Sequence, residues 1–491
     1  MVFGYYPHCT PCHSRAGGNL EQYNWTPAYA GVTIEGRAMI KKSKKPLGAG
    51  LRKFFTLLFA CLFLCLSTAQ TGDIPKDQFI SDEEIEQTLT DWLSQIFKVA
   101  NVSMKPKVLI LSSPEVNAGA TLGGMIIVYT GLILKCQNVN QLLGVLAHET
   151  GHIAGAHSAR AAEAQNQALV PAVATMLLSG AAALAAGSPD LLAAGLAGGA
   201  QVFERGLLKH SRDQEETADA SALRYLTALG WPTRGLGEFL HLLDTNYTGP
   251  TDPYTLTHPL SNERREKVSL FERQALVNVQ TLPKEEGKFQ RIKGKINGFM
   301  NKPDAVLREY KSTDKSIAAR YARSIALYRK GRHSEALAVL QGLIDEHPSD
   351  PFFLELKGQI YFETGKISEA ASYFRQALKL LPKAQTISML LAQALLESQI
   401  PDSKILDEAV SLLMEVVDHA PENVFAWRLL AKAYGRKNQM DHMALCLAEE
   451  AFLFNNVPMA KSQAQKASKS KDPIVAKRAK DILGQIEPAG A

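Results

Sequence analysis

The pattern of apolar and polar positions in the N-terminal half predicts a small sheet packed among helices. Ser81–Glu84 has the sequence of a capping box and precedes a segment with one apolar helical face. Val108–Leu111 reads as a buried strand, and Met125–Tyr129 reads as a second one after a glycine pair. Gln141–Ala159 then has the period of a helix that is apolar on one side.

From about residue 315 the apolar period becomes that of a helical repeat. Trp427, Leu430 and Tyr434 match the tetratricopeptide signature, with Ala431 in its glycine position. Such repeats stack into a curved solenoid with a concave binding surface, whereas the alternative is an unrelated helical bundle. Three pairs of landmark residues recur at a spacing of 34: Pro348 and Pro382, Gly331 and Gly365, Ala336 and Ala370.

A basic segment beginning at Met39 precedes a run of 13 apolar or uncharged residues, Phe54–Leu66. Small residues at Ser67 and Ala69 complete the pattern of a secretory signal peptide. The run is shorter than the roughly 20 residues that span a bilayer. An uncleaved membrane anchor is the alternative, and a lipoprotein site at Cys61 fits less well because bulky Phe59 precedes it.

Residues 1–38 precede this signal and resemble translated intergenic repeat DNA, so we interpret them as a mis-assigned upstream extension. Cys9–His13 within them fits the haem-attachment pattern CxxCH, but it lies ahead of the export signal with no domain around it. We therefore expect no haem.

Composition and charge narrow the class of protein. The 491 residues are 46% hydrophobic, which excludes collagen-like and wholly disordered chains. The net charge of +5 arises in the first 69 residues, which hold eight bases and two acids; the rest is nearly neutral, so we expect no nucleic-acid partner. Cys136 and Cys446 read as buried residues or free thiols. The Ala/Gly-rich stretch Leu169–Val202 reads as two closely packed helices or as a membrane-touching hairpin.

The candidate chemistry begins at the HExxH motif His148–His152. Two histidines four residues apart lie on one helix face and can share a zinc ion. Glu149 lies about 100° around the helix from His148, where a general base can reach a bound water. His157 is nine residues from His148 and falls on the opposite face, so we do not expect it to be a ligand.

A second acidic motif offers the third ligand. In Ser211–Asp219, Glu215 and Asp219 are four residues apart, so both can face the same site. We expect Glu215 to bind the metal and Asp219 to hold a ligand histidine through its free N–H. Glu216 has only Ala220 as its corresponding partner.

Together these motifs resemble the gluzincin type of site, and more narrowly the HtpX and CAAX-prenyl-protease group of zinc metallopeptidases. That group's pattern HExxH…SRxxExxAD…HPxxxxR is met by His148–His152, Ser211–Asp219, His258-Pro259 and Arg264. With a signal peptide before it and repeats after it, the chain is similar to periplasmic members of this group that act in β-barrel assembly.

The resemblance implies one zinc ion per subunit held by His148, His152 and Glu215, with Glu149 as the catalytic base. It also implies that His258 is an oxyanion donor or a fourth ligand that blocks water in a resting enzyme. Arg264 is expected to brace its loop.

The same resemblance implies a substrate-binding strand. Asn117-Ala118 and Gly123-Gly124 correspond to the family's active-site strand, whose exposed edge would pair with an extended peptide.

The expected fold is α+β and mostly α: a metallopeptidase domain with a small β-sheet, followed by an α-solenoid of tetratricopeptide repeats. We expect a Sec signal peptide at 39–69, the peptidase at 70–300, a linker at 301–315, repeats at 316–470 and a tail at 471–491.

The expected function is periplasmic cleavage of unfolded or misassembled outer-membrane proteins. The repeats are expected to recruit these clients or the β-barrel assembly machinery. Peripheral association with the outer membrane is an open alternative. The alternatives are a repeat scaffold or chaperone with incidental proteolysis, and a membrane-embedded protease that spans at Leu169–Leu184.

Overall fold

The computed structural model describes residues 78–121, 124–156, 212–246, 254, 258–274, 282–398 and 402–486. The expected signal peptide, the rejected haem motif, His157, Gly123 and the Leu169–Val202 stretch lie outside these ranges. In the described part, no helix is both long and apolar enough to cross a membrane.

A four-stranded sheet with the order β1-β2-β4-β3 lies in the N-terminal half. Strands β2 and β4 pair in parallel, with Val108 opposite Ile126, and the other two pairs are antiparallel. The two strands expected from the sequence are present as β2 and β4, and β3 forms an edge of the sheet. The strands are β1 (Gln78–Ile80), β2 (Lys107–Ser112), β3 (Ala118–Ala120) and β4 (Met125–Tyr129).

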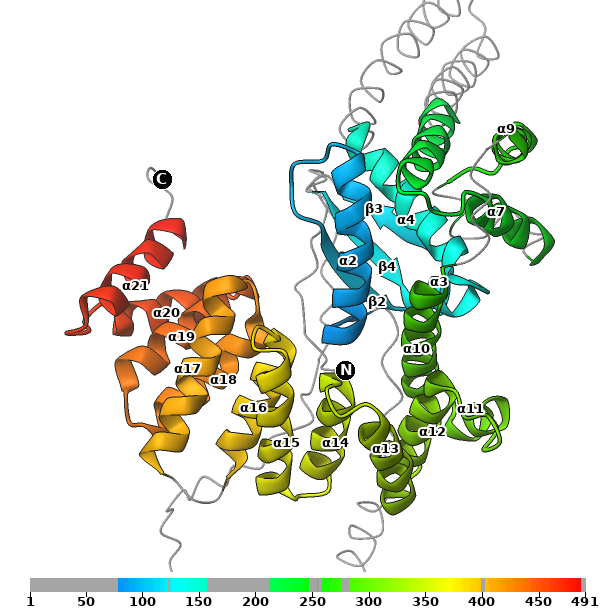
Figure 1. The fold of residues 1–491 in the computed structure, drawn as a ribbon. Coiled ribbons are helices and arrows are strands. Elements are labelled where there is room, and N and C mark those ends of the chain that lie inside the picture. Colours follow the sequence, from blue (N-terminus) through cyan, green and yellow to red (C-terminus); the bar gives the residue numbers. More distant parts are fainter. Residues whose placement is uncertain are drawn as a thin grey trace, which may run out of the picture. The chain divides into compact units, whose positions relative to one another are not determined.

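Helices pack around this sheet and form the rest of the domain (Figure 1). One of them, over residues 212–228, follows a part of the chain that the structure does not describe. The others are α2 (Glu83–Val99), α3 (Thr130–Lys135), α4 (Val139–Ala154), α7 (Arg234–Asn246), α9 (Asn262–Gln274) and α10 (Pro283–Met300).

The N-terminus of α2 corrects the expected capping box by one residue. The cap is Asp82, whose side chain accepts a hydrogen bond from the Ile85 backbone N–H at 3.1 Å. Glu86, rather than Glu84, accepts in return from the Asp82 backbone N–H at 2.8 Å. Glu84 is instead buried against Arg291 and Lys295 from α10, which are distant in sequence.

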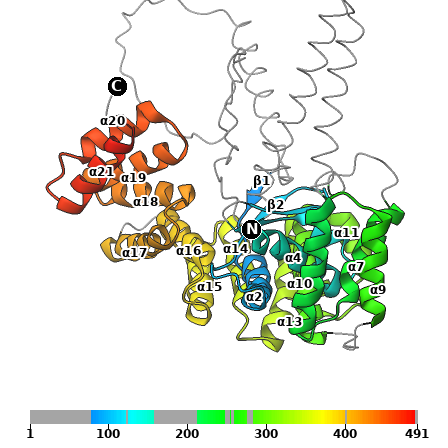
Figure 2. The same cartoon turned by 90° about the horizontal axis from the view of Figure 1, so that it is seen from above.

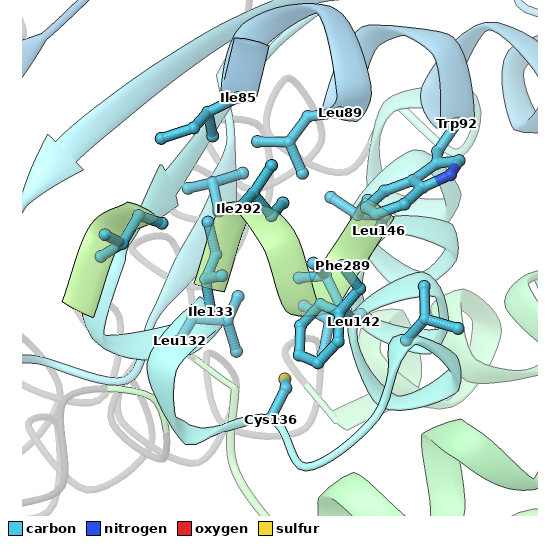
Figure 3. Close-up of a cluster of buried hydrophobic side chains, with 14 of the residues drawn as sticks. Ile85, Leu89, Trp92, Leu132, Ile133, Cys136, Leu142, Leu146, Phe289 and Ile292 are labelled. Carbon is cyan, nitrogen blue, oxygen red and sulfur yellow. The ribbon is translucent and has the colours of Figure 1, made fainter. Parts of the chain in front are cut away.

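The apolar core of the domain fixes α4 between α2, α3 and α10 (Figure 3). All three neighbouring helices contribute fully buried side chains, so the position of α4 is set along much of its length. Trp92 adds a hydrogen bond from its indole N–H to Glu285 at the start of α10. The residues drawn from these helices include Ile85, Leu89, Trp92, Leu132, Ile133, Leu142, Leu146, Phe289 and Ile292.

The C-terminal half is a series of helix pairs that follow one another in chain order (Figures 1 and 2). Gly331 and Gly365 both adopt φ of 76° at the turn within a pair, a conformation that favours glycine. Their 34-residue spacing confirms the repeat predicted from the sequence. The helices are α11 (Pro303–Glu309), α12 (Ile317–Arg329), α13 (His333–Glu346), α14 (Pro351–Glu363), α15 (Ile367–Leu380), α16 (Gln385–Glu397), α17 (Ser403–His419), α18 (Val424–Arg436), α19 (Met440–Leu453), α20 (Val457–Ala467) and α21 (Pro473–Ile486).

Two segments carry more structure than the sequence suggested. Helix α11 lies within residues 301–315, the expected linker, and α21 occupies most of the expected tail. Helix α21 is held by a small apolar cluster that includes Val475, Ala479 and Ile482. Cys136 and Cys446 are buried free thiols, as predicted.

The start of α2 contacts the repeat helices directly. Ser81 Oγ lies 3.2 Å from Thr386 Oγ1 on α16, and the Thr386 backbone N–H donates to Glu83 at 3.1 Å. Lys295 lies 2.8 Å from Asp82 Oδ2 and 3.1 Å from Glu84 Oε2, and all three side chains are buried. Hydrogen bonds therefore connect the start of α2 to α16 of the repeats, and buried ion pairs hold the same segment against α10.

Candidate metal centre

Helix α4 brings His148 and His152 together, one turn apart. Their Nε2 atoms lie 3.1 Å apart, and their rings meet at 77° with centroids separated by 4.7 Å. Asn138 caps the helix by accepting a hydrogen bond from the Gln141 backbone N–H. His148 is fully buried, and His152 retains 9% of its exposure. The HExxH spacing thus presents two imidazole nitrogens to one point.

The helix over residues 212–228 supplies a carboxylate at the same point. Glu215 Oε2 lies 3.3 Å from His148 Nε2, and Glu215 Oε1 lies 3.2 Å from His152 Nε2. This helix approaches α4 very closely at Gly151, where an added Cβ would lie 2.9 Å from the Ala218 carbonyl oxygen. A glycine inside HExxH therefore permits the approach that brings Glu215 to the histidines.

His258 completes the group from the other side. Its Nδ1 lies 3.2 Å from both Glu215 carboxylate oxygens and 3.4 Å from His148 Nε2. Its Nε2 lies 3.5 Å from Glu149 Oε1. The ligand atoms of His148, His152, Glu215 and His258 all lie within 4.8 Å of one another.

The spacing of these donor atoms fits a metal ion. Ligand atoms about 2.1 Å from a tetrahedral zinc ion lie about 3.4 Å from one another. The measured separations of 3.1–3.4 Å among the three imidazole nitrogens and Glu215 match that figure. Imidazole and carboxylate are also the ligand types that zinc takes in hydrolytic sites. The four side chains can therefore hold a metal.

Asp219 and Arg264 contact the donor side chains without belonging to the four donors themselves. Asp219 Oδ1 lies 2.8 Å from His148 Nδ1, which leaves Nε2 as the atom that faces the centre. Arg264 Nη1 lies 2.9 Å from Glu215 Oε2, and its other nitrogens contact Asp219. Arg264 also donates to the Pro259 carbonyl oxygen at 2.9 Å, beside His258. Glu216 lies outside this group and pairs with exposed Lys267 at 2.7 Å.

The electrostatics of the site favour the charged forms of His148, Glu215 and Asp219, although all three side chains are buried. Burial alone would lower the pKa of His148, but hydrogen bonds to Asp219 and Glu215 raise it to about 10. Burial would raise the pKa of Glu215, yet hydrogen bonds from the three histidines hold it well below its usual range. The pKa of Asp219 is lowered in the same way by His148 and Arg264. Burial lowers the pKa of His152, so the positive charge is stabilised at His148, between Glu215 and Asp219.

Glu149 is placed differently from the other acids. It is fully buried, and among the described residues neither of its carboxylate oxygens has a hydrogen-bond partner. Its contact with His258 Nε2, at 3.5 Å, is longer than a typical hydrogen bond. A buried carboxylate that accepts no hydrogen bond is costly in an isolated protein and is typical of a group that a further molecule engages. Its orientation leaves it available for a water molecule beside the donors.

The residues predicted to border a substrate lie at and beside an edge of the sheet, as far as the structure describes them. Ala118 begins β3, which pairs only with β4 in the described part of the chain and packs against α4. The Asn117 carbonyl oxygen accepts from the Tyr129 backbone N–H at 3.1 Å, and Gly124 adopts φ of 72° in the turn to β4. These residues are not among the four donors; they form the sheet edge beside the helix that carries HExxH.

Two residues of the site were not predicted. Tyr254 is fully buried and lies against the His258 ring, and Phe239 from α7 lies against Tyr254. An isolated aromatic in an apolar stretch is typical of an ordinary core position, so the sequence carried no signal for either.

Comparison with known proteins agrees with this geometry. Residues 82–271 match the model of peptidase family M48, and residues 304–351 and 351–384 match tetratricopeptide repeat models. The beta-barrel assembly-enhancing protease of Yersinia pestis is 26% identical over 358 residues, covering 72% of each chain. The protein of the same name from Escherichia coli K12 is 26% identical over 403 residues, covering 79% of this chain and 80% of that protein.

A further relative matches a shorter part of the chain. The metalloprotease YcaL of Escherichia coli K12 is 31% identical over 160 residues, which is 32% of this chain and 59% of that protein. The chain therefore contains a peptidase family M48 domain followed by tetratricopeptide repeats, and its enzymatic class is that of a metalloendopeptidase.

Proposed function

We propose that this chain is a zinc-dependent endopeptidase of the periplasm that cleaves unfolded or misassembled outer-membrane proteins. The observation that carries the proposal is the convergence of His148, His152, Glu215 and His258 on one point, with the buried carboxylate of Glu149, which accepts no hydrogen bond among the described residues, beside it. A scaffold without hydrolytic activity would have no use for such a buried carboxylate next to a donor set.

In this proposal His148, His152 and Glu215 hold one zinc ion. When bound, zinc acts as a Lewis acid and lowers the pKa of a water molecule toward about 7. Glu149 accepts the proton from the attacking water and later delivers it to the leaving amine. Asp219 keeps the His148 ring in the orientation that presents Nε2, and Arg264 balances the charges of Glu215 and Asp219.

His258 has two possible positions in this cycle. With Nδ1 3.2 Å from the Glu215 carboxylate, it takes the fourth corner of the donor set and excludes water. Turned away from that corner, its imidazole becomes available as a hydrogen-bond donor to the oxyanion. We propose that the arrangement described here is the resting one. His258→Ala would then raise basal proteolysis, and an unchanged basal rate would count against a blocking role.

The edge strand supports a preference for unfolded chains. A peptide that pairs with β3 from Ala118 onward makes main-chain hydrogen bonds, which depend little on side-chain sequence. We propose Asn117, Ala118, Gly123 and Gly124 as the residues that border this peptide. An extended peptide is available only from a client that has not folded.

Location and partners are proposed from the predicted signal peptide and from the names of the relatives. The two relatives of similar length are called beta-barrel assembly-enhancing proteases. We propose that the repeats recruit outer-membrane clients or the assembly machinery, since stacked repeats provide a broad surface without chemistry of their own. Peripheral association with the outer membrane would follow from such partners.

The central experiment combines metal analysis with casein cleavage for the purified wild-type protein and Glu149→Gln. We expect one zinc per chain in both proteins and cleavage only in the wild type. Glu216→Gln is the matched control, because this partly exposed neighbour of Glu215 pairs with Lys267 and should leave zinc content and cleavage unchanged. Casein degradation by Glu149→Gln at the wild-type rate would remove the enzymatic proposal and leave the scaffold alternative.

A further inference from the structure

Three aromatic rings form a column that ends at the candidate metal centre. Phe239 on α7 contacts Tyr254 edge-on, with centroids 5.3 Å apart and an interplanar angle of 84°. Tyr254 in turn lies against the His258 imidazole at a tilt of 30°, with centroids 4.6 Å apart. Phe239 and Tyr254 are fully buried, and His258 is 6% exposed. The column thus runs from the apolar core to a donor of the site.

The backbone alone leaves the His258 ring free to turn. The His258 N–H donates to the Tyr254 carbonyl oxygen at 2.7 Å, which closes one turn of chain but does not restrain the side-chain torsions. The neighbouring imidazoles lie farther from the ring and at steeper angles: His148 at 5.2 Å and 72°, and His152 at 5.3 Å and 55°. The ring of Tyr254 is the surface that covers one face of the imidazole.

The ring contact accompanies a defined position of the two nitrogens of His258. With the Tyr254 ring against one face of the imidazole, Nδ1 lies 3.2 Å from Glu215 and Nε2 lies 3.5 Å from Glu149. A ring turned by a large angle would lose the stacked contact and these two polar contacts together. An aromatic pair of this kind changes an equilibrium by about twofold to tenfold beyond simple area burial.

We propose that Tyr254 is a positioning residue that holds His258 at the fourth corner through ring stacking, and so sets how much of the protein rests in the blocked arrangement. The proposal rests on the proposed role of His258. Tyr254 does not touch the metal-binding point as a donor; it acts through the histidine.

The test measures the His258 ring directly, in the full chain freed of metal by a chelator. Diethyl pyrocarbonate modifies accessible imidazoles, and mass spectrometry of the His258 peptide gives its rate. Tyr254→Leu should raise that rate by about twofold to tenfold, the range that loss of an aromatic contact allows. Tyr254→Phe, which keeps the ring, should restore the wild-type rate. Phe374→Leu, a fully buried aromatic of the repeats, is the control for a general loss of packing and should leave the rate unchanged.

A kinetic measurement on the zinc-loaded protein accompanies the labelling. Tyr254→Leu should raise kcat for casein by a similar factor with KM unchanged, because the peptide-binding strand is not altered. A wild-type labelling rate in Tyr254→Leu, or equal rates in the Leu and Phe variants, would overturn the proposal, as would a fall in kcat. The labelling needs neither zinc nor activity, so failure of the peptidase proposal through Glu149→Gln is a separate result.

Discussion

Arg264 and Asp219 form a two-point ion pair inside the candidate metal centre. Arg264 Nε lies 2.7 Å from Asp219 Oδ2 and Nη2 lies 2.9 Å from Oδ1, and both side chains are at least 95% buried. The same guanidinium reaches Glu215. One arginine therefore holds both acids of the 212–228 helix in the orientation that the histidines need.

Replacing this arginine should destabilise the fold. Arg264→Met leaves two buried carboxylates without their cation, a change that costs about 3–5 kcal/mol in typical proteins. We expect the free energy of unfolding to fall by about that amount, measured by urea denaturation of the metal-free protein. Lys267→Met is the control, since its ion pair with Glu216 is exposed and should matter little. Equal stability of the two variants would contradict this account of Arg264.

Asp219 should affect metal binding more than it affects catalysis itself. Asp219→Asn weakens the contact to His148 Nδ1 and with it the orientation of the ring. Changes of this kind typically reduce metal affinity by about 10- to 100-fold. Competition with a fluorescent zinc chelator measures the affinity. Asp213→Asn, an exposed acid on the same helix, should retain wild-type affinity. Unchanged zinc affinity in Asp219→Asn would exclude the supporting role.

Gly151 should be essential for the close approach of two helices. Gly151→Ala adds a Cβ that would lie 2.9 Å from the Ala218 carbonyl oxygen, so the helices must separate. We expect a loss of stability of about 1–3 kcal/mol together with weaker zinc binding, because Glu215 moves away from the histidines. Gly287→Ala in α10 meets no atom within 4 Å and is expected to be neutral or slightly stabilising. Thermal unfolding and zinc titration distinguish the two outcomes.

The start of α2, which contacts α16 of the repeats, should depend on Lys295 of α10. Lys295→Met leaves Asp82 and Glu84 buried without this cation, which costs about 3–5 kcal/mol by the same reasoning. We expect faster amide hydrogen exchange at the start of α2 and in α16, which meet through Ser81 and Thr386. Lys284→Met, exposed on the same helix, is the control. Exchange confined to α10 would show that the ion pairs do not couple the two halves.

The pH dependence of stability should reflect the acids at the start of α2. Burial raises the pKa of Glu86 to about 7, although hydrogen bonds from Asp82 and Ser81 oppose it. The folded protein therefore binds a proton more tightly than the unfolded chain does between about pH 4.5 and 7. The contribution of Glu86 to the free energy of unfolding is complete below pH 4.5 and is lost as the pH rises through 7.

Glu86→Gln tests whether stability falls with rising pH because of this acid. The variant should flatten the decline in the free energy of unfolding between pH 4.5 and 7.5, whereas Asp91→Asn, exposed on the same helix, should leave the slope as it is. A slope that is unchanged in Glu86→Gln would show that this acid does not titrate with folding.

Short-range spacing predicted much of the site, because a helix converts four-residue spacing into shared direction. His148 with His152 and Glu215 with Asp219 needed no tertiary information to be paired. The N-terminus of α2 shows what short-range spacing cannot predict. Glu84 was expected in the cap but pairs with Arg291 and Lys295 of α10, some 200 residues later. Tyr254 shows the same limit, since its role depends on which ring the fold places beside it.

The measurement that tests the central claim most directly is zinc K-edge X-ray absorption of the zinc-loaded protein. We predict one zinc per chain with nitrogen and oxygen ligands at about 2.0–2.1 Å and scattering from three imidazoles, one of which disappears in His258→Ala. A site with sulfur ligands, or one whose spectrum is unaffected by Glu215→Gln and His258→Ala, would contradict the placement of the metal among these residues.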